Sequence, residues 1–97
     1  MPRRFRNVSG PEIRRHRMAQ ELSQDQLAAR LQLAGLDHLD RVALAKIESQ
    51  IRSVFDWELA VIADVLGVEV SGLLPPVQKL KPELNGLIAG KRDKAAD

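Results

Sequence analysis

The sequence predicts an all-α fold made of five short helices. Apolar residues recur three and four positions apart over most of the chain, which is the spacing of one helix face. Segments of alternating apolar and polar residues, which favour strands, are almost absent. Helix start and stop signals divide the apolar pattern into short lengths. At 97 residues, the chain is expected to form one small domain.

The first helix is expected from residue 11 to about residue 21. Proline is favoured at the first position of a helix, and Pro11 stands there. Ser9 or Gly10 would precede it as the cap. Glu12 places a negative charge at the positive end of the helix dipole, which also favours a helix start at this point.

The residues before this helix, 1–9, are basic and show no helical spacing, so we expect a flexible N-terminal arm. Arginine is favoured where such an arm lies along a phosphate backbone or enters a minor groove. The candidate DNA-contacting residues of the arm are Arg3, Arg4 and Arg6. The same segment also fits a solvated tail without contact to nucleic acid.

Two amphipathic helices joined by a loop occupy the centre of the sequence, residues 22–48. Ser23 followed three positions later by Gln26 is a capping box, which predicts the start of the second helix. Each helix has an apolar stripe, formed by Leu27 and Leu31 in the second helix and by Leu44 and Ile47 in the third. Two short helices joined by a turn, with small residues where they touch, describe a helix-turn-helix.

The connecting loop, residues 32–40, is expected to fold back onto the core because it contains Leu33, Leu36 and Leu39. Asp40 is expected to cap the third helix, which would run from about residue 41 to residue 50. A metal site formed by Asp37, His38 and Asp40 is an alternative. Three ligands within four residues of one loop, with no second cluster, make a poor site, so we expect no metal and no cofactor.

The fourth helix is expected from residue 56 to residue 66, with Ser53 and Asp56 as its cap and Gly67 at its end. Trp57 would lie either at the edge of the core or in an interface. A short fifth helix would follow and end at two prolines; its apolar residues are Val70, Leu73 and Leu74.

The helix-turn-helix domain is therefore expected to span residues 10–76, followed by a partly ordered tail, residues 77–97. If the tail forms helical turns, Leu84, Leu87 and Ile88 would share one face. A dimerisation helix is the alternative interpretation of this tail.

Composition and charge argue against several functional classes. There is no cysteine, which suits the cytoplasm and excludes thiolate chemistry. The histidines stand apart and no glycine-rich phosphate loop follows a strand, so an enzyme is not expected. No apolar run indicates a membrane span or a secretory signal.

Charge is unevenly distributed along the chain. Residues 1–17 contain six arginines and one glutamate, a net charge of +5, whereas residues 54–74 contain four carboxylates and no Lys or Arg, a net charge of −4. A basic end and an acidic end favour an oriented approach to a polyanion such as DNA. Uneven charge is also found in small proteins that bind no polyanion.

The segments LSQDQLAARL, LAKIES and ELAVIADVLGVEVSGLLP follow one another between residues 22 and 75. Their order and spacing resemble the Cro/repressor-type (XRE-like) helix-turn-helix family, and the resemblance covers residues 13–75. It implies a five-helix, lambda-repressor-like DNA-binding domain. The turn between the second and third helices is about six residues longer than the three or four that are usual, and it resembles an extended-turn branch of the family.

This resemblance also implies roles for individual residues. Arg17 matches a family arginine that forms a structural ion pair with a glutamate of the third helix, here Glu48. Gln24 matches a position that contacts the phosphate backbone. Ser49 and Arg52, which follow the third helix, are further phosphate candidates.

The third helix is the expected recognition helix, whose N-terminal residues would approach base edges in the major groove. Arg41 would bind guanine, either Val42 or Ala43 would contact a thymine methyl group, and Lys46 would reach a base or a phosphate.

The expected function is a sequence-specific transcriptional regulator in the cytoplasm, associated with the nucleoid. It would act as a homodimeric repressor that binds inverted half-sites of double-stranded DNA. One alternative is an antitoxin whose C-terminal tail binds a toxin. The other is an adaptor that binds protein instead of DNA, an interpretation favoured by the extended loop, Asp40 and the acidic fourth helix.

Overall fold

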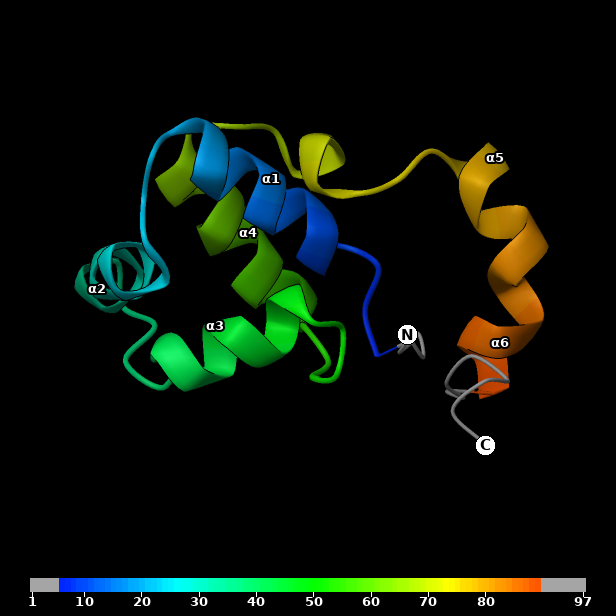
Figure 1. Cartoon of the computed structure of the whole chain (residues 1–97), viewed down its shortest axis with the longest axis horizontal. Helices are drawn as coiled ribbons and strands as arrows, with labels where there is room; N and C mark the ends of the chain where they lie inside the picture. The colour runs from blue at the N-terminus through cyan, green and yellow to red at the C-terminus, as the bar shows by residue number, and fades with distance from the viewer. Residues whose placement is uncertain (1–5, 90–97) are drawn as a thin grey trace.

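The computed structural model describes residues 6–89, and all regular secondary structure in that range is helical (Figure 1). The α-helices α1 (Gly10–Ala19), α2 (Gln24–Leu33), α3 (Arg41–Glu48) and α4 (Asp56–Leu66) come first. They are followed by the 3₁₀ helix η1 (Val70–Leu73), by α5 (Val77–Leu80), by the 3₁₀ helix η2 (Lys81–Glu83) and by α6 (Leu84–Ala89). The predicted all-α fold is confirmed, with η1 in the place of the fifth helix.

One apolar core lies between α1, α2, α3, α4 and η1. Each of these elements contributes side chains with no accessible surface: Ile13, Leu27, Leu31, Leu44, Ile47, Ile62 and Leu73. Burial of an apolar side chain of this size stabilises a fold by about 1.5–3 kcal/mol. The packing fixes α2 and α3 against α1 and α4, so the outer side of α3 has a defined position in the molecule.

The starts of α2 and α3 and the end of α4 follow the predicted local signals. The Ser23 hydroxyl accepts a hydrogen bond from the Gln26 N–H (3.0 Å), and the Gln26 side-chain oxygen accepts one from the Ser23 N–H (2.8 Å). The Asp40 carboxylate accepts a hydrogen bond from the Ala43 N–H at 2.9 Å and caps α3. Gly67 ends α4 with a φ of 72°, a left-handed conformation that glycine adopts without strain.

The cap of α4 differs from the prediction. The sequence favours Ser53 and Asp56 for this role, but Phe55 occupies the N-cap position. Its N–H donates to a carboxylate oxygen of Glu58 at 3.0 Å. The helix still begins at Asp56, as expected, but the carboxylate that caps it belongs to a buried residue.

The extended turn, residues 34–40, folds against the core through two of its leucines. Leu36 and Leu39 are 5% and 0% exposed. Leu33, expected to do the same, is 90% exposed because it lies in the last turn of α2 on the solvent side. Gly35 follows α2 with a φ of 108°, a conformation that side-chain-bearing residues rarely adopt.

Residues 6–9 are attached to the end of α3, so the expectation of a flexible arm that extends to residue 9 is wrong for this part. The side-chain amide of Asn7 donates to the carbonyls of Ile47 (3.0 Å) and Arg52 (2.8 Å), and its oxygen accepts from the Gly10 N–H (2.8 Å). The last carbonyls of a helix lack partners within the helix, which explains why an asparagine binds here. Arg3 and Arg4 lie outside the described residues.

The N-terminus of α1 lies directly against the C-terminus of α3. A Cβ atom at Gly10 would stand 2.1 Å from the Ile47 carbonyl oxygen, a distance that no side-chain-bearing residue tolerates without backbone movement. Glycine therefore allows α1 and α3 to approach each other at this point.

Residues 77–89 form a helical arm, made of α5, η2 and α6, that stands away from the rest of the molecule (Figure 1). Pro75 and Pro76 connect it to η1. Within residues 6–89, no single helix is long and apolar enough to cross a membrane. Only α4 taken together with Val70–Ala89 meets that length and composition, and this pair is bent by 101°.

Candidate nucleic-acid interface

The outward side of α3 is polar, basic and exposed. α3 lies along one edge of the molecule, with α1 and α4 on its inner side (Figure 1). Leu44 and Ile47 point into the core, whereas Arg41, Val42 and Lys46 of the helix are exposed, as is Ser49, which caps its C-terminus. Because residues three and four apart share one helix face, Val42, Lys46 and Ser49 form one continuous strip.

Two shallow depressions border this strip, and both are lined by Val42, Lys46 and Ile51. Val42 is 52% exposed and Ile51 is 44% exposed. Ile51 was not among the predicted site residues, because it follows the helix and its sequence pattern gives no sign of exposure. The apolar side chains of Val42 and Ile51 therefore lie beside the Lys46 ammonium group on the outer surface.

A buried ion pair fixes α3 to α1. The Arg17 guanidinium donates to both carboxylate oxygens of Glu48, from Nε at 2.8 Å and from Nη2 at 2.9 Å, and Nη1 donates to the Leu22 carbonyl at 2.7 Å. The hydrogen bond to Glu48 raises the pKa of Arg17 above its ordinary value, although burial acts in the opposite direction. The structure thus contains the expected Arg17–Glu48 pair, and the two hydrogen bonds to Glu48 tie α3 to α1.

Gln24, at the start of α2, joins this network. Its side-chain amide donates to a Glu48 carboxylate oxygen at 3.1 Å, and the residue is half-buried. The side chain therefore already has a protein partner at the position where a phosphate contact was expected.

A second buried carboxylate, that of Glu58, ties the extended turn and the α3–α4 loop to α4. It has no accessible surface and accepts hydrogen bonds from His38 Nε2 (2.6 Å) and from both terminal nitrogens of Arg52 (3.1 Å each). Burial alone would raise the pKa of Glu58, but the hydrogen bonds from Arg52, His38 and the Phe55 N–H outweigh it and lower the pKa from 4.5 to about 2. Glu58 is therefore held as an anion that anchors both loops beside α3.

The structure brings some of the predicted DNA-contacting residues together and leaves others occupied. Arg52 uses its guanidinium to bind Glu58 and the Ser53 carbonyl, so it is a structural residue here rather than a free phosphate ligand. Ala43 is half-buried against the core, which leaves Val42 as the exposed apolar residue of the pair. Arg6 is exposed, and its N–H donates to the Gln50 carbonyl beside the end of α3.

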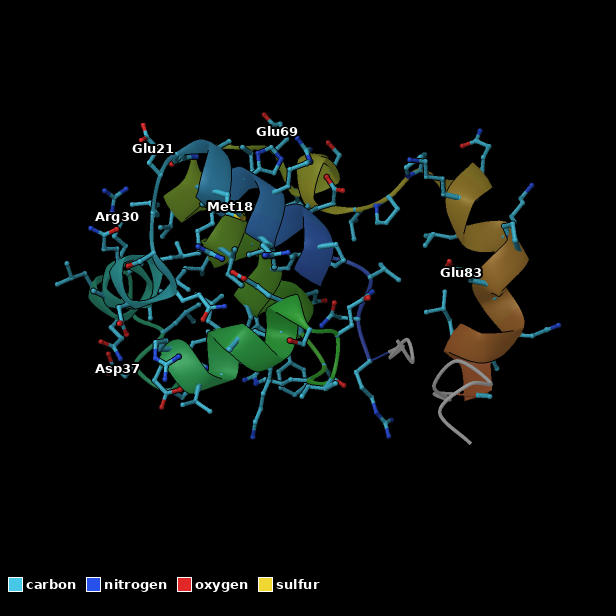
Figure 2. All side chains as sticks on the ribbon, in the orientation of Figure 1. Met18, Glu21, Arg30, Asp37, Glu69 and Glu83 are labelled. Carbon is cyan, nitrogen blue, oxygen red and sulfur yellow. The ribbon has the colours of Figure 1, made fainter. Side chains whose placement is uncertain are left out.

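Arg41 remains accessible. It forms an ion pair with Asp25 of α2 at 3.5 Å, and both side chains are more than half exposed. An exposed pair of this kind contributes little to stability, about 0–1 kcal/mol, and its guanidinium is easily transferred to another acceptor. Acidic groups lie nearby as well, since Asp40 caps α3 and Asp37 lies in the extended turn (Figure 2).

An exposed aromatic pair lies at the start of α4. The rings of Phe55 and Trp57 stack with a centroid distance of 5.6 Å and an interplanar angle of 5°, and both residues are more than half exposed. Trp57 is therefore not part of the core.

No protein-family model matches this chain, and no curated protein matches it. Among solved structures, the crystal structure of the DNA-binding domain of BldD is similar, with a TM-score of 0.62 and 30% sequence identity. The alignment covers 73% of this chain and 94% of that chain. The chain belongs to the same helix-turn-helix family. In this helix-turn-helix, α2 and α3 are the paired helices, and the extended turn connects them.

Proposed function

We propose that the protein is a sequence-specific, DNA-binding transcriptional regulator of the Cro/repressor type. The observation that carries the proposal is the outward side of α3, where Arg41, Val42 and Lys46 are exposed on a helix fixed by a buried ion pair. The similar BldD structure is a DNA-binding domain, which supports the same use for this helix.

In the proposed complex, the N-terminal half of α3 enters the major groove. Arg41 stands at the first position of the helix and would bind the O6 and N7 atoms of a guanine. Val42 would contact a thymine methyl group, and Lys46, one turn further along, would bind a base or a phosphate. Ser49 and Arg6, at the far end of the helix, would contact the backbone.

The regulator would act as a homodimer on an inverted repeat. Two copies of α3 would occupy successive major grooves on one side of the duplex, about 34 Å apart. The simplest consequence is repression, because a dimer bound across a promoter would exclude the transcription machinery.

A charge-matched pair of variants tests whether α3 is the DNA-binding surface. Replacing both Arg41 and Lys46 with alanine should strongly weaken binding to duplex DNA. It should also reduce the salt dependence: the slope of log binding constant against log salt concentration should become shallower by about 0.9 for each phosphate that is no longer neutralised. The matched control is Arg14→Ala combined with Arg30→Ala, because both arginines are exposed and lie on α1 and α2. Fluorescence anisotropy over a salt series would measure the affinity of each double variant for duplex DNA and its dependence on salt. Equal reductions in affinity for the two variants would contradict the proposal.

Arg41 is expected to determine sequence preference at one base pair. Arg41→Ala should reduce discrimination at that base pair by about 1–3 kcal/mol and leave the other positions nearly unchanged. Competition binding with single-base-pair variants of the preferred duplex would measure this. A uniform loss of affinity across all duplexes would show that Arg41 binds the DNA backbone instead.

The second candidate is a protein-binding adaptor, and the exposed Phe55–Trp57 stack favours it. Exposed tryptophan is enriched in protein interfaces, and the exposed Asp56 between the two rings in sequence brings negative charge to this surface. Partner binding that does not weaken with salt, together with no detectable binding to duplex DNA, would favour the adaptor.

A further inference from the structure

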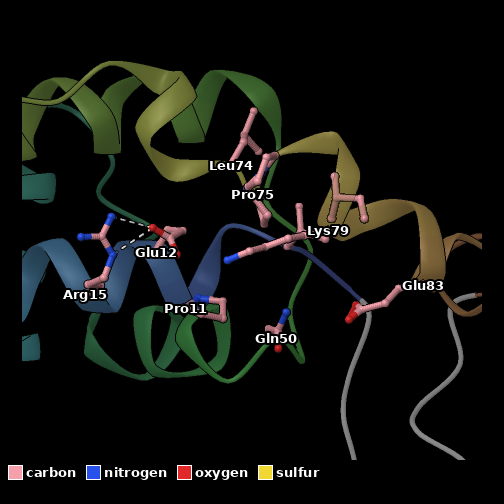
Figure 3. A pocket seen from close by; sticks show the side chains of 11 residues that line it. Pro11, Glu12, Arg15, Gln50, Leu74, Pro75, Lys79 and Glu83 are labelled. Carbon is pink, nitrogen blue, oxygen red and sulfur yellow. Dashed lines mark hydrogen bonds and ion pairs between the residues drawn. The ribbon is translucent and has the colours of Figure 1, made fainter.

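The helical arm, residues 77–89, has an apolar face that no other described element covers. Val77, Leu84 and Ile88 are 62%, 45% and 81% exposed, and Leu80 and Leu87 are half-buried. A groove with a volume of about 570 Å³ separates the arm from α1 and borders Leu80. Its opposite wall is formed by Pro11, Glu12 and Arg15 (Figure 3), so α1 does not close over the apolar face.

Four of the large apolar residues of the arm follow a heptad, and the fifth, Ile88, comes directly after it. Val77, Leu80, Leu84 and Leu87 are spaced by three, four and three residues, which is the alternation of a and d positions in a coiled coil. The intervening positions hold polar residues, proline and glycine: Gln78, Lys79, Lys81, Pro82, Glu83, Asn85 and Gly86. The arm therefore has one narrow apolar seam of the kind that packs against another helix.

We propose that this seam pairs with the same seam of a second copy of the chain, in an antiparallel orientation. If Pro82 of one copy lies opposite Pro82 of the other, Val77 faces the partner's Leu87 and Leu80 faces the partner's Leu84. Each a position then packs against a d position, as in antiparallel helix pairs. A surface complementary to itself is what an interface with two-fold symmetry requires.

The features of the chain favour a second copy over other occupants. Residues 90–97, GKRDKAAD, contain no large apolar side chain that would cover the seam. Pro75 and Pro76 restrict the backbone between η1 and the arm, and the groove between the arm and α1 leaves the seam without a partner from α1. An isolated helical segment as short as the arm is only marginally stable in water, so pairing would also stabilise it.

The seam is short, so we expect a dimer that dissociates on dilution. The few apolar residues of each copy bury less surface than the roughly 800 Å² per partner of a standard interface. The pairing supplies the dimer interface of the proposed regulator and rests on the proposed function for that role. The pairing itself requires no DNA and is measured without it.

Disulfide cross-linking tests the orientation directly, because the chain has no cysteine of its own. Val77→Cys and Leu87→Cys are made as separate single variants of the full chain. In the antiparallel pair, residue 77 lies beside residue 87 of the partner, whereas two copies of residue 77 lie about 15 Å apart along the axis. A disulfide does not span that distance. A cross-linked dimer is expected in the mixture of the two variants and not in either variant alone.

Sedimentation velocity of the full chain over a concentration series provides the second measurement. Leu84→Glu, which places a charge in the seam, should convert the dimer to monomer at every concentration tested. Asn85→Glu, an exposed neighbour outside the seam, should leave the dimer unchanged. Circular dichroism checks that both variants are folded. Both are expected to fold, because neither residue lies in the core.

The remaining outcomes would overturn the inference. Cross-linking of each cysteine variant with itself would show a parallel or unspecific association. A chain that stays monomeric, or a dimer unaffected by Leu84→Glu, would show that the seam does not pair with itself. Specific DNA binding by such a chain would leave the proposed function standing, so the two failures are distinguishable.

Discussion

Replacing Glu48 with alanine is expected to destabilise the fold by about 3–5 kcal/mol. The substitution leaves the Arg17 guanidinium in a buried position without the carboxylate that receives two of its hydrogen bonds. It also removes the acceptor of the Gln24 side chain. Urea unfolding followed by circular dichroism would measure the change in the free energy of unfolding.

The matched control is Glu12→Ala. Glu12 forms an ion pair with Arg15 at 2.7 Å, but 30% of the Glu12 side chain and 62% of the Arg15 side chain are exposed. Removing this exposed pair should cost about 1 kcal/mol or less. Similar destabilisation by Glu48→Ala and Glu12→Ala would show that the buried pair does not fix α3.

Acid is expected to remove the stabilisation that Glu58 provides. The pKa of Glu58 is about 2 in the folded chain and 4.5 as its ordinary value. Because the folded state has the lower pKa, the contribution is fully present above about pH 4.5 and is lost as the pH falls toward 2. A difference of this size corresponds to a free energy on the order of 3 kcal/mol.

Glu58→Gln isolates this effect. The variant retains the shape of the side chain but lacks the charge that binds Arg52 and His38. It should be less stable than the unsubstituted chain at pH 7, and the two unfolding free energies should converge as the pH falls toward 2. Glu69→Gln, at an exposed position, is the control and should follow the unsubstituted chain at every pH. A constant difference between Glu58→Gln and the unsubstituted chain would contradict the assignment.

Local sequence signals are sufficient to predict most of the fold. The capping box of Ser23 and Gln26, the cap at Asp40 and the end of α4 at Gly67 depend on residues close together in the chain, and each is present in the structure. The helical spacing of the apolar residues likewise predicts the core. The Arg17–Glu48 pair joins distant residues, and it is expected only because of the family resemblance.

The features that the sequence analysis missed are contacts that the patterns of capping and helical spacing do not indicate. Asn7 lies 40 residues from Ile47, and no local pattern predicts that it binds the end of α3. Arg52 was expected to bind phosphate because it follows the third helix, but its guanidinium binds the Glu58 carboxylate of α4, a contact that no sequence pattern indicated. Glu58 stands three positions after Phe55, as the glutamate of a capping box does, but Phe55 has no side-chain oxygen and so lacks the other half of that pattern.

Selection of bound sequences from a pool of random DNA duplexes, followed by a salt titration on the most enriched sequence, tests the proposed DNA-binding function most directly. A dimeric regulator should enrich an inverted repeat with half-sites about one helical turn apart, and its affinity should fall steeply as salt rises. An unenriched pool with weak binding that is indifferent to sequence would contradict the proposed function and would direct attention to a protein partner.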